Sequence, residues 1–159
     1  MTGTDYTYRS ATSDDIDMIV DLWWIAAQYH ADLESRFQYT SNAKEATKEY
    51  FLKQMASDDT FIVIAMKRNN ALGFISATII ERPPIHVQRK IGYIDSLFVK
   101  PSVRRKGIGS NLWSLAMEWL KHHEISKINL AVASKNALGI SFWKKFGFEE
   151  ITCNYEVDI

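Results

Sequence analysis

The stretch from residue 92 to residue 109, G-Y-I-D-S-L-F-V-K-P-S-V-R-R-K-G-I-G, decides the fold of this chain. It predicts a strand, a turn at the proline, and a basic, glycine-containing loop that leads into a helix. Backbone N–H groups at such a loop and helix start form a site for an anion such as a phosphate. The loop lacks the lysine of the P-loop motif, and Gly107 and Gly109 supply only two of the three glycines of the dinucleotide fingerprint. The sequence therefore predicts a phosphate cradle of another type.

Composition and charge limit the kinds of protein that this chain can be. Its 159 residues suit one domain, residues 1–159, with enough hydrophobic residues for a core. Nineteen basic residues balance nineteen acidic ones, so no overall charge draws the chain to nucleic acid or to an anionic membrane. A single cysteine, Cys153, excludes an internal disulfide framework. With no apolar run of about 18 residues and no signal peptide, we expect a cytoplasmic protein.

Hydrophobic periodicity predicts the order of strands and helices. Strands are expected over residues 7–11, 60–66, 71–81, 91–99, 127–133 and 148–157, and helices over residues 14–29, 42–56, 106–122 and 138–146. Residues 30–37 have no clear period and are expected to form a loop or a short irregular helix. Hairpin-linked strands followed by a strand–helix–strand unit predict an α/β fold of the α+β, mixed-sheet kind. The central sheet is expected to be mostly antiparallel, with six to seven strands and helices on both faces.

Two motifs together make the chain resemble a known family. Residues 104–109, R-R-K-G-I-G, fit the acyl-CoA motif [RQ]-x-x-G-x-[GA] of the GCN5-related N-acetyltransferases, the GNAT superfamily. Residues 136–148, N-A-L-G-I-S-F-W-K-K-F-G-F, resemble a second motif of that family, N-x-x-[AG]-x-x-F-Y-x-K-x-G-F. The predicted order of elements also agrees with the family over nearly the whole chain. The resemblance implies one N-acetyltransferase domain of GNAT fold, with acetyl-CoA as co-substrate and no metal.

The resemblance also implies which residues hold coenzyme A. The helix start and its basic neighbours would bind the phosphates, the exposed backbone of the preceding strand would bind the pantetheine arm, and the second motif would complete the site. These residues are Leu97, Phe98, Val99, Arg104, Arg105, Lys106, Gly107, Ile108, Gly109, Ser110, Asn136, Phe142, Trp143 and Lys145. To admit the arm, the strand of Asp95 is expected to splay from the strand of Leu130.

Asp95 is the residue that we expect to act as the catalytic base. An amine attacks a thioester only when neutral, so a base must take its proton, directly or through water. Burial in a mostly apolar strand raises the pKa of a carboxyl group, which suits it to this task. A period of two places Asp95 on the same face as Tyr93 and Leu97. Polyamine-type relatives have an acidic base at this position. The alternative is a structural carboxylate satisfied by backbone N–H groups.

Trp143 departs from the family pattern. That position usually holds a tyrosine that protonates the departing CoA thiolate, and an indole N–H is not a useful acid. The proton is therefore expected from solvent, from Tyr93 or from another tyrosine such as Tyr155, unless the thiolate leaves unprotonated. The departure also keeps open a second class of function, an acyl-CoA sensor or regulatory module without turnover.

The acceptor is expected to bind after the first helix, where this superfamily commonly forms its acceptor pocket. Tyr29, His30, Asp32 and Tyr93 are the candidate substrate-binding residues, and the acidic residues nearby favour a small cationic amine or a peptide amine. Polyamines, metabolites, antibiotics and protein N-termini all remain open. Nucleic-acid binding through residues 104–106 is disfavoured by the neutral net charge, and no membrane partner is expected. A homodimer is compatible with the aromatic closing strand.

Overall fold

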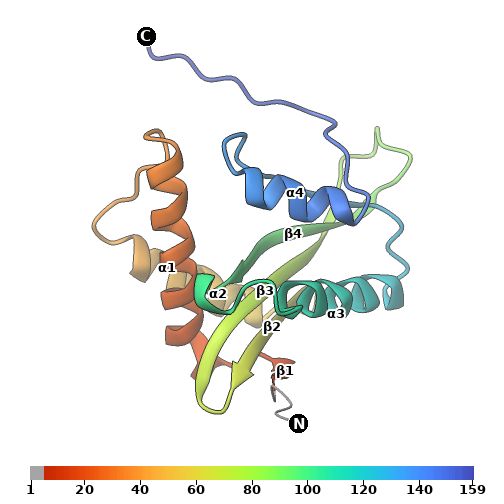
Figure 1. The fold of residues 1–159 in the computed structure, drawn as a ribbon. Helices are drawn as coiled ribbons and strands as arrows, with labels where there is room; N and C mark the ends of the chain where they lie inside the picture. Colours follow the sequence, from red (N-terminus) through yellow and green to blue (C-terminus); the bar gives the residue numbers. More distant parts are fainter. Residues whose placement is uncertain (1–5) are drawn as a thin grey trace.

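A computed structural model describes residues 6–159, which form one mixed sheet with helices on both faces (Figure 1). The strands are β1 (Thr7–Ser10), β2 (Thr60–Lys67), β3 (Asn70–Glu81), β4 (Lys90–Val99) and β5 (Ile128–Leu130). They lie in the order β1-β2-β3-β4-β5. The first four pair antiparallel, and β5 pairs with β4 in parallel. The predicted mixed, mostly antiparallel sheet is therefore confirmed. The first five residues of the predicted 1–159 domain lie outside the described part.

Within residues 6–159, four α-helices cover the sheet, two on each face (Figure 1). They are α1 (Ile16–Leu33), α2 (Ala43–Met55), α3 (Ile108–His122) and α4 (Ala137–Lys145), with short 3-10 turns at Ser13–Asp15 and Pro101–Val103. Adjacent residues of β3 point to opposite faces, as strand geometry requires. Phe74 therefore packs beneath α1 and α2, while Ile75 packs beneath α3. This two-sided burial explains why β2 and β3 are continuous apolar runs.

Helix α1 is longer than the periodicity predicts. It continues to Leu33, so its last turn takes in part of the segment that was expected to be a loop or an irregular helix. In the 3-10 turn that leads into α1, Thr12 and Asp15 form a reciprocal cap, in which the backbone N–H of Thr12 donates to Asp15 at 2.9 Å. Arg9 of β1 donates to both carboxylate oxygens of Asp15, at 2.6 and 2.7 Å. The first strand and the first helix are thereby fixed to each other.

The predicted closing strand, residues 148–157, is wrong. Phe148 still packs edge-on against Trp113, 5.4 Å between ring centroids, but the chain then leaves the sheet (Figure 1). Ile151 and Tyr155 are 76% and 94% exposed. The residues alternate as a strand does, yet a strand also needs a paired neighbour, and the described chain offers none here. In the described part of the chain the sheet has five strands rather than six or seven, and β5 is shorter than the predicted 127–133.

Candidate active site

Asp95 lies at a β-bulge in the middle of β4. Ser96 pairs with Ser76 of β3, but Ile94 pairs with Ala77, so Asp95 is one extra residue without a partner in the ladder. Such a bulge bends the strand and changes the direction of the side chains around it. The exact register of two strands determines its position, and a single strand pattern does not reveal it.

The bulge changes which residues share a face with Asp95. Its carboxylate meets Thr78 of β3 and Tyr50 of α2, whereas Leu97 packs into the core on the α3 side. The predicted common face of Asp95 and Leu97 is therefore wrong, because the extra residue reverses the alternation. The common face with Tyr93 is confirmed, since Tyr93 pairs directly with Thr78.

Two hydroxyl groups donate to the Asp95 carboxylate. The Thr78 Oγ1 hydroxyl lies 2.7 Å from Oδ2, and the Tyr50 hydroxyl lies 3.4 Å from Oδ1. Burial raises the pKa of Asp95 above its ordinary value, while the hydrogen bonds from Thr78 and Tyr50 act in the opposite direction. The expected direction of the shift is confirmed. A backbone N–H also contributes, as the alternative of a structural carboxylate expects, but its effect on the pKa of Asp95 is smaller than those of Thr78 and Tyr50.

Beyond the bulge, β4 and β5 separate. Their pairing covers only Gly92–Ile128, Tyr93–Asn129 and Ile94–Leu130, while β4 continues to Val99. The predicted splay is confirmed. A cavity of about 730 Å³ opens at this point, lined by residues 94–99 on one side and 130–132 on the other. The backbone groups of β4 that face away from β3 are therefore available to a ligand.

This cavity brings together most of the predicted site residues. They are Tyr29, His30, Asp95, Leu97, Phe98, Val99, Arg104, Arg105, Gly107, Ile108, Gly109, Ser110, Asn136, Phe142, Trp143 and Lys145. Three predicted site residues do not line it. Lys106 is exposed on the loop before α3, Asp32 is exposed in the last turn of α1, and Tyr93 lies on the far side of the bulge, next to Thr78.

The loop before α3 has the backbone conformation that an anion site needs. Gly107 has φ +81°, a left-handed conformation that favours glycine, and it is the N-cap of α3. The next three residues start a helix, so their N–H groups have no carbonyl four residues back within it. Gly109 packs closely against Phe142, since a Cβ there would lie 3.3 Å from the ring. Arg104 donates through Nε to the carbonyl of Val99 at 2.9 Å, which holds the loop against the end of β4.

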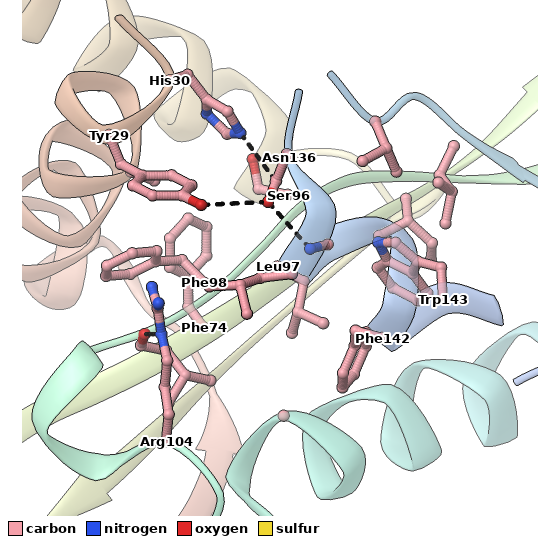
Figure 2. A pocket seen from close by; sticks show the side chains of 18 of the residues that line it. Tyr29, His30, Phe74, Ser96, Leu97, Phe98, Arg104, Asn136, Phe142 and Trp143 are labelled. Atoms are coloured by element: carbon pink, nitrogen blue, oxygen red, sulfur yellow. Dashed lines mark hydrogen bonds between the residues drawn. The ribbon is translucent and has the colours of Figure 1, made fainter. Parts of the chain in front are cut away.

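Helices α1 and α4 meet across the cavity at Asn136. Its Oδ1 accepts from the N–H of Gly139 at 3.0 Å, which caps α4, and from the Tyr29 hydroxyl at 3.5 Å (Figure 2). His30 Nε2 lies 3.4 Å from Asn136 Nδ2. Burial lowers the pKa of His30, so the ring is favoured in its neutral form. Two residues from one end of α1 therefore lie against the second sequence motif.

Comparison with known proteins identifies the family. The model of the acetyltransferase (GNAT) family matches residues 18–148. This chain belongs to the GNAT family. It is 28% identical over 145 residues to an uncharacterised N-acetyltransferase of Methanocaldococcus jannaschii, covering 91% of this chain but only 61% of that protein. It is 25% identical over 156 residues to an N-alpha-acetyltransferase of Saccharolobus solfataricus, covering 94% of this chain and 83% of that protein.

The fold is also that of solved GNAT structures. One is the crystal structure of a predicted acetyltransferase with acetyl-CoA from Clostridium acetobutylicum, with a TM-score of 0.77 and 22% identity, covering 96% of each chain. The predicted GNAT fold is therefore confirmed. At the level of the family, the prediction of a GNAT acetyltransferase is confirmed as well.

Trp143, where this GNAT chain departs from the motif, is a packing residue. It is 9% exposed, and its ring meets those of Trp113, Phe142 and Phe148 edge-on, at 5.4, 5.0 and 5.2 Å between centroids. Neither tyrosine that we considered in its place lines the cavity, because Tyr93 lies next to Thr78 and Tyr155 is exposed on the tail. The tyrosines that do line this GNAT cavity are Tyr29 and Tyr39.

Some functional candidates have no signal in the sequence. Thr78 and Tyr50 contact Asp95 only because β3 pairs with β4 and α2 covers that face. Trp23 and Tyr39, which line the GNAT cavity on its α1 side, look like ordinary core residues in the sequence. Across residues 6–159, no group of three His, Cys, Asp or Glu side chains is placed to hold a metal ion. No helix in that range is long and apolar enough to span a bilayer.

Proposed function

We propose that this protein transfers the acetyl group of acetyl-CoA to a primary amine by direct attack in a ternary complex. The observation that supports this most is the bulge, because it brings the Asp95 carboxylate to the cavity that the start of α3 also lines. The helix start that suits an anion and the half-buried carboxylate then line one cavity. The Clostridium neighbour, whose structure contains acetyl-CoA, supports the choice of donor.

The donor would lie along the splayed part of β4. The free N–H groups at the start of α3, with Arg105 and Lys145 in the same lining, suit the phosphates of coenzyme A. The unpaired edge of β4 at residues 97–99 would bind the pantetheine arm as an added strand does. N–H groups of the same edge would stabilise the negative charge on the thioester oxygen during attack.

Asp95 would act as the base. As the amine nitrogen forms its bond to the thioester carbon, its proton passes to Asp95, directly or through water, and the carbon–sulfur bond then breaks. The leaving thiolate needs a proton, and the Tyr29 hydroxyl is the donor that we assign to it. Tyr29 lines the cavity from α1 and already donates to Asn136 across it.

The acceptor is a primary amine, and the Saccharolobus relative, named as an N-alpha-acetyltransferase, supports a peptide amine as one source. The competing proposal is an acyl-CoA sensor without turnover, and Trp143 is the observation that favours it, since no acid stands at that position. The homodimer and the cytoplasmic location stay predictions.

Release of free thiol tests the proposal when it is combined with calorimetry of acetyl-CoA binding. We expect Asp95→Asn to lower kcat by about a hundredfold or more, the usual contribution of a general base. The affinity for acetyl-CoA should stay within about twofold, because Asp95 lies outside the cradle. Asp32→Asn is the matched control, since Asp32 is an exposed carboxylate outside the cavity lining. Tight binding of acetyl-CoA with no amine-dependent thiol release would favour the sensor instead.

A further inference from the structure

The charge of the cavity limits the acceptors that it can hold. Asp95 is the one carboxylate among the described lining residues, beside the cations Arg104, Arg105 and Lys145. The acidic residues that suggested a cationic acceptor lie elsewhere. Asp32 is outside the lining, and Glu34 is already paired with Lys135, whose Nζ lies 2.9 Å from Oε2. A polyamine or an aminoglycoside brings several positive charges, and this lining compensates only one of them.

The cavity wall on the α1 side is aromatic. Trp23, Tyr39 and Phe98 belong to it, and the rings of Trp23 and Tyr39 meet edge to face, 5.6 Å between centroids. Phe98 is 6% exposed and faces the same side of the sheet as Asp95. Tyr39 is 39% exposed, so the wall is buried at Phe98 and open at its outer end. An apolar wall and the one acidic side chain of the described lining therefore belong to the same cavity.

We infer that the acceptor is a molecule with one primary amine next to an apolar or aromatic group, and not a polycation; this inference rests on the proposed function. The apolar group would lie on the wall of Trp23, Tyr39 and Phe98, and the amine would meet Asp95. Apolar surroundings lower the pKa of a bound amine, which releases the proton that blocks attack. Aromatic rings also bury a large apolar area for each side chain.

Two sources share this chemistry, a free small amine and the N-terminus of a peptide with an apolar first residue. The experiment therefore compares phenethylamine and phenylalanyl-alanine amide with spermidine and kanamycin, each with acetyl-CoA and the intact protein. We expect kcat/KM for at least one of the first two to exceed that of both polycations by about tenfold or more. The ratio of the kcat/KM values for phenethylamine and for the peptide shows whether the acceptor is a free amine or a peptide N-terminus.

Variants of the wall add a second readout. Trp23→Leu should raise KM for the preferred amine by about tenfold, with little change in kcat and in the affinity for acetyl-CoA, because it removes binding surface only. Trp119→Leu is the matched control. Trp119 is also half-buried, but it lies outside the cavity lining and stacks on Phe61, away from the wall.

The outcomes separate this inference from the proposed function. Preference for spermidine or kanamycin would overturn the inference while the acetyltransferase activity stands. If no amine releases thiol, the proposed function fails. The inference is then tested by measuring the binding of phenethylamine and of spermidine to the protein in the presence of free coenzyme A. Quenching of tryptophan fluorescence by phenethylamine, absent in Trp23→Leu, would then support the apolar subsite. Equal or tighter binding of spermidine would refute it.

Discussion

Replacing Thr78 by valine removes the shortest hydrogen bond to the proposed base. Thr78 Oγ1 donates to Asp95 Oδ2 at 2.7 Å, whereas the remaining donor, the Tyr50 hydroxyl, is 3.4 Å away and on an exposed side chain. Valine has nearly the same shape but no hydroxyl, so the change acts on the carboxylate more than on packing. The ionised form of Asp95 loses a partner, and its pKa, which burial already raises, should rise further.

The size of the effect follows from the strength of the bond. A hydrogen bond to a charged group contributes about 1.5–3 kcal/mol, and one pKa unit corresponds to about 1.36 kcal/mol. Water and Tyr50 replace part of the lost hydrogen-bond energy, so we expect Thr78→Val to raise the pKa of Asp95 by about one unit. Asp95 works as a base only when ionised, and activity is lost as the pH falls through its pKa. The acidic limb of kcat/KM should therefore move to higher pH by about one unit.

The assay is thiol release over a pH series, with saturating acetyl-CoA and a fixed amine. Thr78→Ser keeps the hydroxyl and should keep the acidic limb of the wild type. Thr40→Val is the matched control, because Thr40 lies outside the cavity lining and its hydroxyl donates to Asn42 at 2.7 Å. An acidic limb unchanged in Thr78→Val, or moved equally by Thr40→Val, would remove this hydrogen bond from the mechanism.

Three further outcomes are expected. Arg9→Ala should lower the free energy of unfolding at neutral pH by about 1–2 kcal/mol in urea titrations, because Arg9 holds the pKa of Asp15 down to about 2. The difference in stability between wild type and Arg9→Ala should fade as the pH falls from about 4 to 2. Gly107→Ala should cost about 1 kcal/mol in the same assay through its positive φ, and calorimetry should show weaker binding of acetyl-CoA. Tyr29→Phe should lower kcat by about tenfold in thiol release, with Tyr39→Phe near wild type; equal rates for the two would refute the assignment of Tyr29 as proton donor.

The cradle and its partner motif were predictable because each is local. Residues 104–109 contain the glycines and cations of an anion site, and residues 136–148 contain the cap and aromatic residues of the helix opposite it. A helix start and a left-handed glycine depend on a few neighbouring residues, so the sequence alone fixes them. Asp95 could also be selected as the candidate base from the sequence, because it is a carboxylate within a mostly apolar strand.

Only the tertiary structure decided how these parts face one another. The bulge at Asp95 arises from the register between β3 and β4, and it turned the carboxylate toward Thr78 and away from the face of Leu97. Residues 148–157 alternate as a strand does, but alternation states a preference, while a strand forms only where another backbone supplies its hydrogen bonds. The aromatic wall and the single lining carboxylate likewise come from elements far apart in the chain. Local patterns determined what each segment is, and pairing between distant segments determined what the site contains.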